Sequence, residues 1–215
     1  ENQCVYGYTG DLSKKCLLSL ADTLSKRFEG ERVLTVTELK QIRYKNRNKI
    51  GRSYVDVPAS EKVDLIKQGI SEIEKYKDDR VKRYIGVFTS QKNDVCVYNS
   101  KGKWFRRVNE YGRIVYQVVV QNEKGFEIGF SGPGAQDDIN FFYNKLDVKK
   151  EAKNTLDTAL TMLDAKECPS GKMPVVIGNG WGGVLFHEAC GHPLEASAVA
   201  KGLSCFCGKE GQLVA

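Results

Sequence analysis

Residues 173–195 constrain this chain more than any other stretch, because they contain both of its histidines and a dense run of glycines. An apolar segment, residues 173–177, leads into a glycine-rich turn and then into a helix-like segment carrying His187, Glu188 and His192. Histidine is the commonest neutral metal ligand, and zinc peptidases hold their ion with two histidines and an adjacent glutamate. The stretch therefore predicts a strand, a tight turn and a helix that bears a metal site.

The spacing between the two histidines is one residue longer than in the usual His-Glu-x-x-His arrangement. At ~100° per residue, five steps place His192 roughly 140° around a regular helix from His187. A π-bulge, or a helix that loosens at Gly191, would bring the rings together. Because Pro193 disfavours helical angles at the residue before it, we expect His192 at a distorted helix end.

Residues 180–195 read Gly-Trp-Gly-Gly-Val-Leu-Phe-His-Glu-Ala-Cys-Gly-His-Pro-Leu-Glu. This run resembles the signature of the TldD/PmbA family of zinc metalloproteases, also called the modulator of DNA gyrase family. Less specific similarity extends to residues 8–13, 57–62, 163–165 and 201–202. The resemblance implies that His187 and His192 are zinc ligands and that Glu188 is the general base that activates zinc-bound water.

The resemblance also implies features outside this chain. In the family, a cysteine from a later domain supplies the third zinc ligand, and an α/β segment precedes the part that begins here. We therefore expect a middle portion of a longer metallopeptidase, lacking the C-terminal domain beyond Ala215 and part of the N-terminal segment, and inactive or weakly active alone. The implied substrates are small or unfolded peptides, and the implied assembly is a dimer with itself or with a homologous subunit.

Cysteine usage and hydropathy indicate the cellular setting. Seven cysteines without regular spacing do not suggest a disulfide framework, so a reducing, cytoplasmic location is expected. No apolar run approaches the roughly 20 residues needed to cross a bilayer, so a membrane partner is not expected.

The sequence is also compatible with three other functions. Gly178, Gly180 and Gly183 form a G-x-G-x-x-G pattern typical of dinucleotide sites, although the expected acidic residue on a second strand is represented only by Glu195. The basic residues between Glu38 and Asp56 could grip nucleic acid, but a solvated linker explains them better. Finally, a non-catalytic subunit or interaction module of a peptidase dimer is compatible with the family resemblance.

The remainder of the chain predicts an α+β fold, in which amphipathic helices pack on an antiparallel meander. Apolar periodicity predicts helices over residues 11–28, 56–76 and 148–165, and residues 196–200 are expected to continue the helix of the metal motif. Short β-prone runs predict strands over residues 32–37, 84–89, 95–98, 104–108, 114–120 and 126–130, with turns at Gly102, Gly112 and Gly125. Cys205 and Cys207 could be additional zinc ligands, but a short strand that places one cysteine on each side explains them better.

This pattern predicts three parts. Residues 1–55 hold a helix, a short strand and a basic linker as part of an N-terminal domain. Residues 56–172 form the α+β core with the meander, and residues 173–215 carry the metal motif and lead into the missing C-terminal domain.

Overall fold

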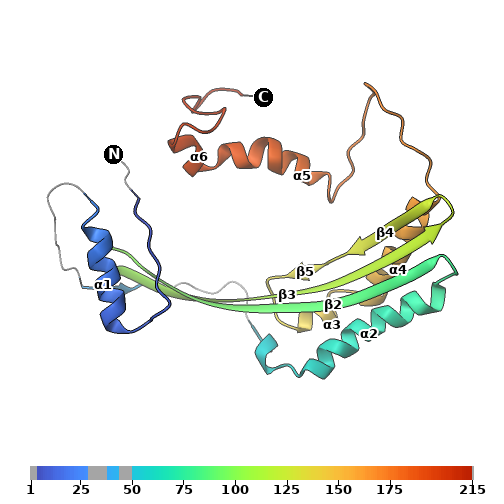
Figure 1. Cartoon of the computed structure of the whole chain (residues 1–215), viewed down its shortest axis with the longest axis horizontal. Helices are drawn as coiled ribbons and strands as arrows, with labels where there is room; N and C mark the ends of the chain where they lie inside the picture. The colour runs from blue at the N-terminus through green and yellow to red at the C-terminus, as the bar shows by residue number, and fades with distance from the viewer. Residues whose placement is uncertain (1–3, 29–37, 44–49, 215) are drawn as a thin grey trace. The chain divides into compact units, whose positions relative to one another are not determined.

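The computed structural model describes residues 4–28, 38–43 and 50–214, and it divides into two compact units, Glu1–Ala165 and Lys166–Ala215. The first unit contains a five-stranded mixed sheet covered by helices, and the second consists of short helical segments and turns (Figure 1). The expected α+β class is confirmed.

Strand β3, Lys103–Asn122, is the centre of the sheet. It pairs antiparallel with β2 (Val81–Tyr98) on one side, and with β4 (Gly125–Ser131) and β5 (Gly134–Ala135) on the other. Strand β1, Lys40–Gln41, joins it in parallel. The predicted meander is therefore present, but its five short strands merge into three longer ones.

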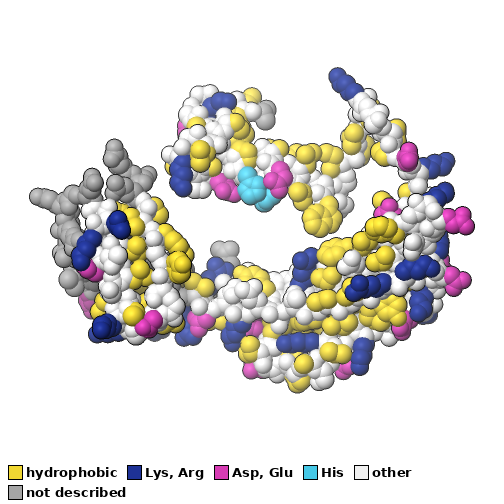
Figure 2. All heavy atoms as spheres, viewed as in Figure 1, with side chains coloured by type: hydrophobic (Ala, Val, Ile, Leu, Met, Phe, Trp, Pro, Cys, Tyr) yellow, Lys and Arg dark blue, Asp and Glu magenta, His cyan; other side chains and the backbone are white. Residues whose placement is uncertain are grey.

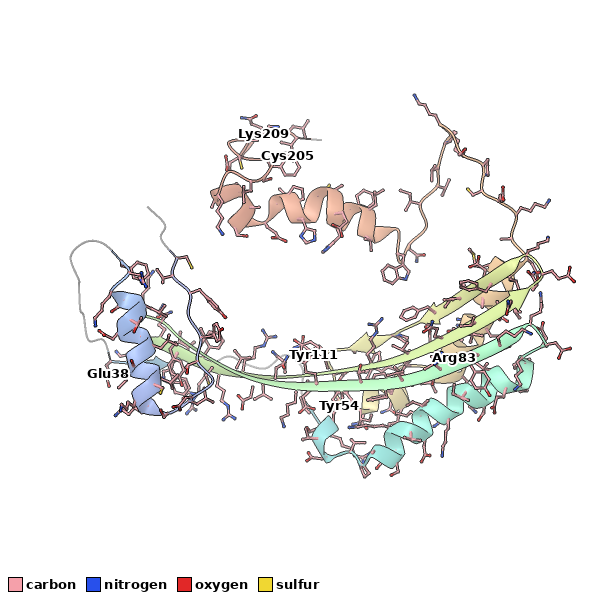
Figure 3. The ribbon with its side chains drawn as sticks, in the orientation of Figure 1. Glu38, Tyr54, Arg83, Tyr111, Cys205 and Lys209 are labelled. Carbon is pink, nitrogen blue, oxygen red and sulfur yellow. The ribbon has the colours of Figure 1, made fainter. Side chains whose placement is uncertain are left out.

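The merging corrects one expectation, the turn at Gly112. This glycine lies inside β3, opposite Ser90, rather than at a reversal of the chain. A Cβ at Gly112 would lie only 2.2 Å from the hydroxyl oxygen of Tyr54, which lies on the helix side of the sheet (Figure 3). Gly112 thus makes room for a buried aromatic side chain, whereas Gly102, with φ of +73°, does occupy a hairpin turn.

Helices α2 (Ala59–Tyr76) and α4 (Val148–Leu163) pack on the same face of the sheet (Figure 1). Pro58 precedes α2, and Asp147 caps α4 by accepting hydrogen bonds from the N–H groups of Lys149 and Lys150. Their bounds agree with the predicted helices to within three residues. On α2, Leu65 and Ile73 are buried and Ile66 and Ile70 pack against the core, whereas Val63 is exposed.

Alternate residues of β3 form the middle of the core, as expected for a strand with one covered face. The buried hydrophobic residues that these elements contribute are Ile114, Tyr116, Val118 and Val120 from β3, Leu65 and Ile73 from α2, and Val148, Ala152, Leu156, Ala159 and Leu163 from α4.

The shorter elements complete the first unit. Helix α1 spans Lys14–Ser25 within the predicted range of residues 11–28, and Ser13 is its N-cap. A 3-10 turn, η1 (Tyr54–Asp56), precedes α2, and α3 (Asn140–Asn144) precedes α4. The strand expected over residues 32–37 and part of the basic stretch lie outside the described residues.

Two buried carboxylates attach the segment before α2 to the rest of the unit. Asp138 accepts hydrogen bonds from the N–H groups of Gly51 (2.6 Å), Arg52 (3.0 Å) and Asn140 (2.9 Å). Glu110 accepts one from the Ser53 hydroxyl (2.6 Å) and one from the Tyr54 N–H (2.9 Å). Burial would raise the pKa of Asp138, but the backbone hydrogen bonds outweigh it and hold that pKa below its ordinary value.

The lowered pKa of Asp138 predicts how acid affects the stability of the fold. The pKa of Asp138 is lower in the folded state, so its carboxylate stabilises the fold above the unfolded-state pKa near 3.8, and the stabilisation is lost as pH falls below that value. We expect Asp138→Asn to lower the free energy of unfolding at neutral pH by on the order of 2 kcal/mol. The variant should also show a shallower loss of stability in acid, measured by urea unfolding from pH 7 to pH 3. Asp157→Asn, at an exposed carboxylate paired with Lys153, is the control, and identical acid slopes for Asp138→Asn and the unsubstituted protein would contradict the assignment.

Close helix packing on β4 gives a second prediction. A Cβ at Gly129 would lie 2.0 Å from the backbone oxygen of Thr155 in α4. Because that oxygen is fixed by the helix, we expect Gly129→Ala to lower the free energy of unfolding by about 1–3 kcal/mol. Gly10→Ala is the matched control, since a Cβ at Gly10 meets nothing within 4 Å. Equal urea midpoints for the two variants would show that α4 can move away from the sheet at little cost.

Candidate metal centre

The second unit carries the histidines on a chain of short helical segments. Helix α5 spans Gly183–Phe186, followed by a π-helical turn at His187–Gly191, a 3-10 turn at His192–Leu194, and α6 at Ala196–Ala200. The strand predicted over residues 173–177 is absent, and none of residues 166–214 pairs in a sheet. An apolar run needs a neighbouring strand to become one, so this expectation was wrong.

Two glycines shape the entry to α5. Gly180 has φ of +87°, in the left-handed region that glycine adopts without strain. A Cβ at Gly182 would lie 2.3 Å from the carbonyl oxygen of Gly178, so the backbone approaches itself closely here. These glycines form a tight turn, and without a preceding strand the turn does not have the strand-to-helix context of a dinucleotide site.

The π-helical turn resolves the spacing problem of the two histidines. The N–H of His192 donates to the carbonyl oxygen of His187, which is a hydrogen bond between residues five apart. The two rings consequently lie side by side, with centroids 4.5 Å apart and planes at 74°. The predicted π distortion is confirmed, but His192 itself keeps helical angles (φ −62°, ψ −43°), so the distortion precedes it.

Three possible ligand groups converge at this turn. One ligand atom from each of His187, Glu188 and His192 lies within 4.8 Å of the other two, and all three side chains are exposed. Figure 2 shows the imidazoles at the surface with acidic side chains beside them. Zinc bonds of about 2.0–2.1 Å place ligand atoms roughly 4 Å apart or less, so small rotations of exposed side chains suffice. This set of nitrogen and oxygen donors fits a divalent ion such as zinc.

Glu195 is a further member of the site that sequence reasoning considered only as a dinucleotide-site acid. Its Oε1 lies 2.6 Å from Nδ1 of His192. This hydrogen bond is the main cause that raises the pKa of His192 above its ordinary value. The spacing of three residues between His192 and Glu195 was the available signal, because such residues face each other on a helical turn.

The cysteines of this unit do not join the group formed by His187, Glu188 and His192 within the described residues. The region around Cys205 and Cys207 forms turns rather than the expected short strand. Cys207 directs its thiol to the carbonyl oxygen of Val199, at 3.3 Å. A local third cysteine ligand is therefore not part of this arrangement.

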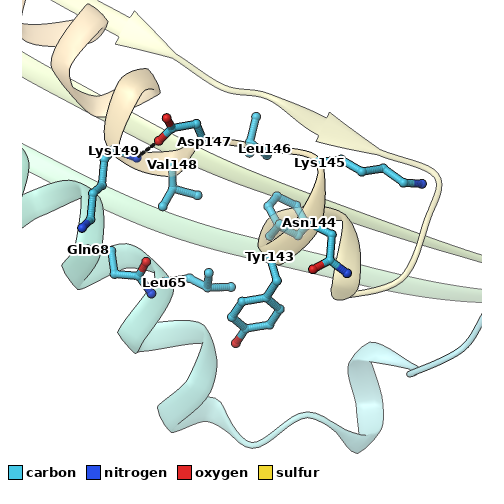
Figure 4. A pocket seen from close by; sticks show the side chains of 10 residues that line it. Leu65, Gln68, Tyr143, Asn144, Lys145, Leu146, Asp147, Val148 and Lys149 are labelled. Carbon is cyan, nitrogen blue, oxygen red and sulfur yellow. Dashed lines mark hydrogen bonds between the residues drawn. The ribbon is translucent and has the colours of Figure 1, made fainter.

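A cleft of about 460 Å³ lies elsewhere, in the first unit, where α2, α3 and α4 meet (Figure 4). Leu65, Phe142, Tyr143 and the residues that lead into α4 line it, and none of its lining residues is a histidine or cysteine. Its one carboxylate, that of Asp147, caps α4. Nothing in this lining resembles a reactive site.

An α+β unit followed by a helix presenting His-Glu-x-x-x-His is the arrangement of a metal-dependent peptidase. The comparisons agree with that class. Residues 52–163 match the PmbA/TldA metallopeptidase central domain, and residues 170–215 match the PmbA/TldA metallopeptidase C-terminal domain. The chain belongs to the PmbA/TldD metallopeptidase family.

Individual relatives that match this chain are also named metalloproteases. A metalloprotease TldD homolog from Buchnera aphidicola is 35% identical over 163 residues, covering 73% of this chain and 34% of the relative. A metalloprotease TldD homolog from Haemophilus influenzae is 33% identical over 142 residues, covering 64% and 30%. The chain thus spans about a third of the length of the curated relatives it matches.

A solved structure supports the fold. A crystal structure from Bacteroides thetaiotaomicron, described as a candidate modulator of DNA gyrase, matches 95% of this chain and 47% of its own with a TM-score of 0.71. Sequence identity is 16%, so the match bears on the fold alone. Among the described residues, none of the helices combines the length and apolar character needed to span a bilayer.

The π-helical turn predicts how the number of residues between the two histidines affects zinc binding. Deleting Ala189 would leave the histidines four residues apart, which a regular helix also places on one face, so zinc binding should persist. Inserting an alanine after Ala189 would separate them by six residues, one more than the five that the π-helical turn spans, and should abolish zinc binding. Ala189→Ser, which keeps the length, is the control. Competition with a chromophoric chelator measures zinc affinity, and loss of binding in the deletion alone would contradict this account.

Proposed function

We propose that the intact protein is a zinc-dependent peptidase that hydrolyses small or unfolded peptides. In this proposal His187 and His192 are zinc ligands and Glu188 is the general base. The observation that carries it is the convergence of two imidazoles and one carboxylate on a single distorted helical turn. Membership of a metallopeptidase family supports the reaction class.

The two imidazoles and the carboxylate take different parts in the proposed reaction. Zinc, when bound, lowers the pKa of a coordinated water towards about 7 and polarises the scissile carbonyl. Glu188 lies beside the imidazoles, with Oε2 3.8 Å from Nε2 of His192, and its exposed carboxylate can reach the same space. It accepts a proton from the attacking water and transfers it to the leaving amine.

The proposal includes a third ligand, a cysteine beyond Ala215, as the family resemblance implies. With two imidazoles alone, we expect this chain to bind zinc weakly and to be inactive or weakly active. We also propose a cytoplasmic location and a dimer with itself or with a homologous subunit. Exposed apolar side chains in the second unit, among them Val176 at 98% and Trp181 at 82%, support burial against further protein.

The role of Glu188 can be separated from metal binding in the intact protein. We expect Glu188→Gln to reduce peptide hydrolysis by about 100-fold or more, because general-base catalysis is lost. Zinc content, measured by mass spectrometry, should stay unchanged, since the imidazoles are retained. Glu167→Gln, an exposed glutamate outside the group, is the control. Undiminished hydrolysis in Glu188→Gln would exclude Glu188 as the base.

A further inference from the structure

The two ring nitrogens of His192 face two different glutamates. Nδ1 lies 2.6 Å from Oε1 of Glu195, within hydrogen-bonding distance. Nε2 lies 3.8 Å from Oε2 of Glu188, a member of the converging ligand group, which is too far for a direct hydrogen bond. Glu195 does not belong to that group, so the two carboxylates occupy distinct places around one imidazole.

The backbone of Glu195 is fixed from both sides. Its N–H donates to the carbonyl oxygen of His192 at 3.1 Å, which closes the 3-10 turn containing Pro193. Its own carbonyl oxygen accepts hydrogen bonds from the N–H groups of Ala198 and Val199, both at 3.0 Å, at the start of α6. The junction between the turn and α6 therefore holds Glu195 where its side chain reaches back to His192.

We propose that Glu195 is the positioning residue of the metal centre: by accepting the Nδ1 proton of His192, it fixes the tautomer whose Nε2 lone pair is directed to the ion. This inference rests on the proposed function. A neutral imidazole carries one N–H, so a proton held at Nδ1 leaves Nε2 free to coordinate. Carboxylates that accept the second N–H of a metal-binding histidine orient the ring and make it a better ligand.

The two histidines differ in this respect. Among the described residues, a carboxylate lies within hydrogen-bonding distance of His192 and none does so for His187, whose ring lies against that of His192. His192 is also the ligand that follows the π-helical turn, where the helix changes its winding. Glu195 thus supports the histidine at the junction between the π-helical turn and the 3-10 turn.

The test uses the 215-residue chain, in which His187 and His192 are the only histidines. The first measurement is the tautomer of each ring in the zinc-free protein, by long-range nitrogen–proton correlation NMR at pH 8, with His187→Ala to assign the signals. We expect His192 to carry its proton at Nδ1, and Glu195→Ala to shift it towards a mixture of tautomers. A merely structural role for Glu195 would leave the tautomer unchanged.

The second measurement is zinc affinity by chelator competition. We expect Glu195→Ala to weaken binding by about 10–100-fold. Glu195→Gln keeps an oxygen acceptor for Nδ1–H and should lose less, and it replaces the alanine variant if that one does not fold. Glu210→Ala, an exposed glutamate in the same unit, should bind as the unsubstituted chain does.

Failure of the role proposed for Glu195 can be distinguished from failure of the proposed peptidase function. Zinc affinity within threefold of the unsubstituted chain for both Glu195 variants, or a His192 proton at Nε2, would overturn the role of Glu195. If the intact protein failed to hydrolyse peptides, the peptidase proposal would fail, while the effects of Glu195 on the tautomer and on zinc affinity would still decide its positioning role.

Discussion

A single backbone hydrogen bond, from the N–H of His192 to the carbonyl oxygen of His187, sets the geometry of the candidate metal centre. A regular helix would place the two imidazoles on different faces, whereas the wider turn brings their centroids to 4.5 Å. Without this bond, Glu188 and Glu195 would flank histidines that could not share an ion. The proposed zinc chemistry therefore depends on a departure from regular helix geometry.

The first unit follows from its sequence in most respects. Alternation along β3 and periodicity along α2 and α4 identify the elements, because each has one buried face. Sequence reasoning placed a turn at Gly112 because glycine commonly marks one. Here glycine is required by Tyr54, a contact between residues 58 positions apart that a local pattern does not contain.

In the candidate site, too, the sequence predicts features that depend on residue type and spacing, and it misses features that depend on contacts with other segments. His187, Glu188 and His192 follow from their residue types, and the π distortion from their spacing. The strand predicted over residues 173–177 did not form, because an apolar run needs a partner and residues 166–214 provide none. Glu195 was missed as a partner of His192 because its orientation depends on the 3-10 turn and on the start of α6.

The two proposed histidine ligands, the base and the positioning residue all lie within nine consecutive positions, residues 187–195. Within the part of the chain that the structure describes, the members of this cluster all belong to the second unit. An insertion of one residue in this segment would therefore remove the metal site while leaving the core of the first unit intact. Within a lineage, a catalytic subunit and an inert scaffold could then diverge through one insertion at this place.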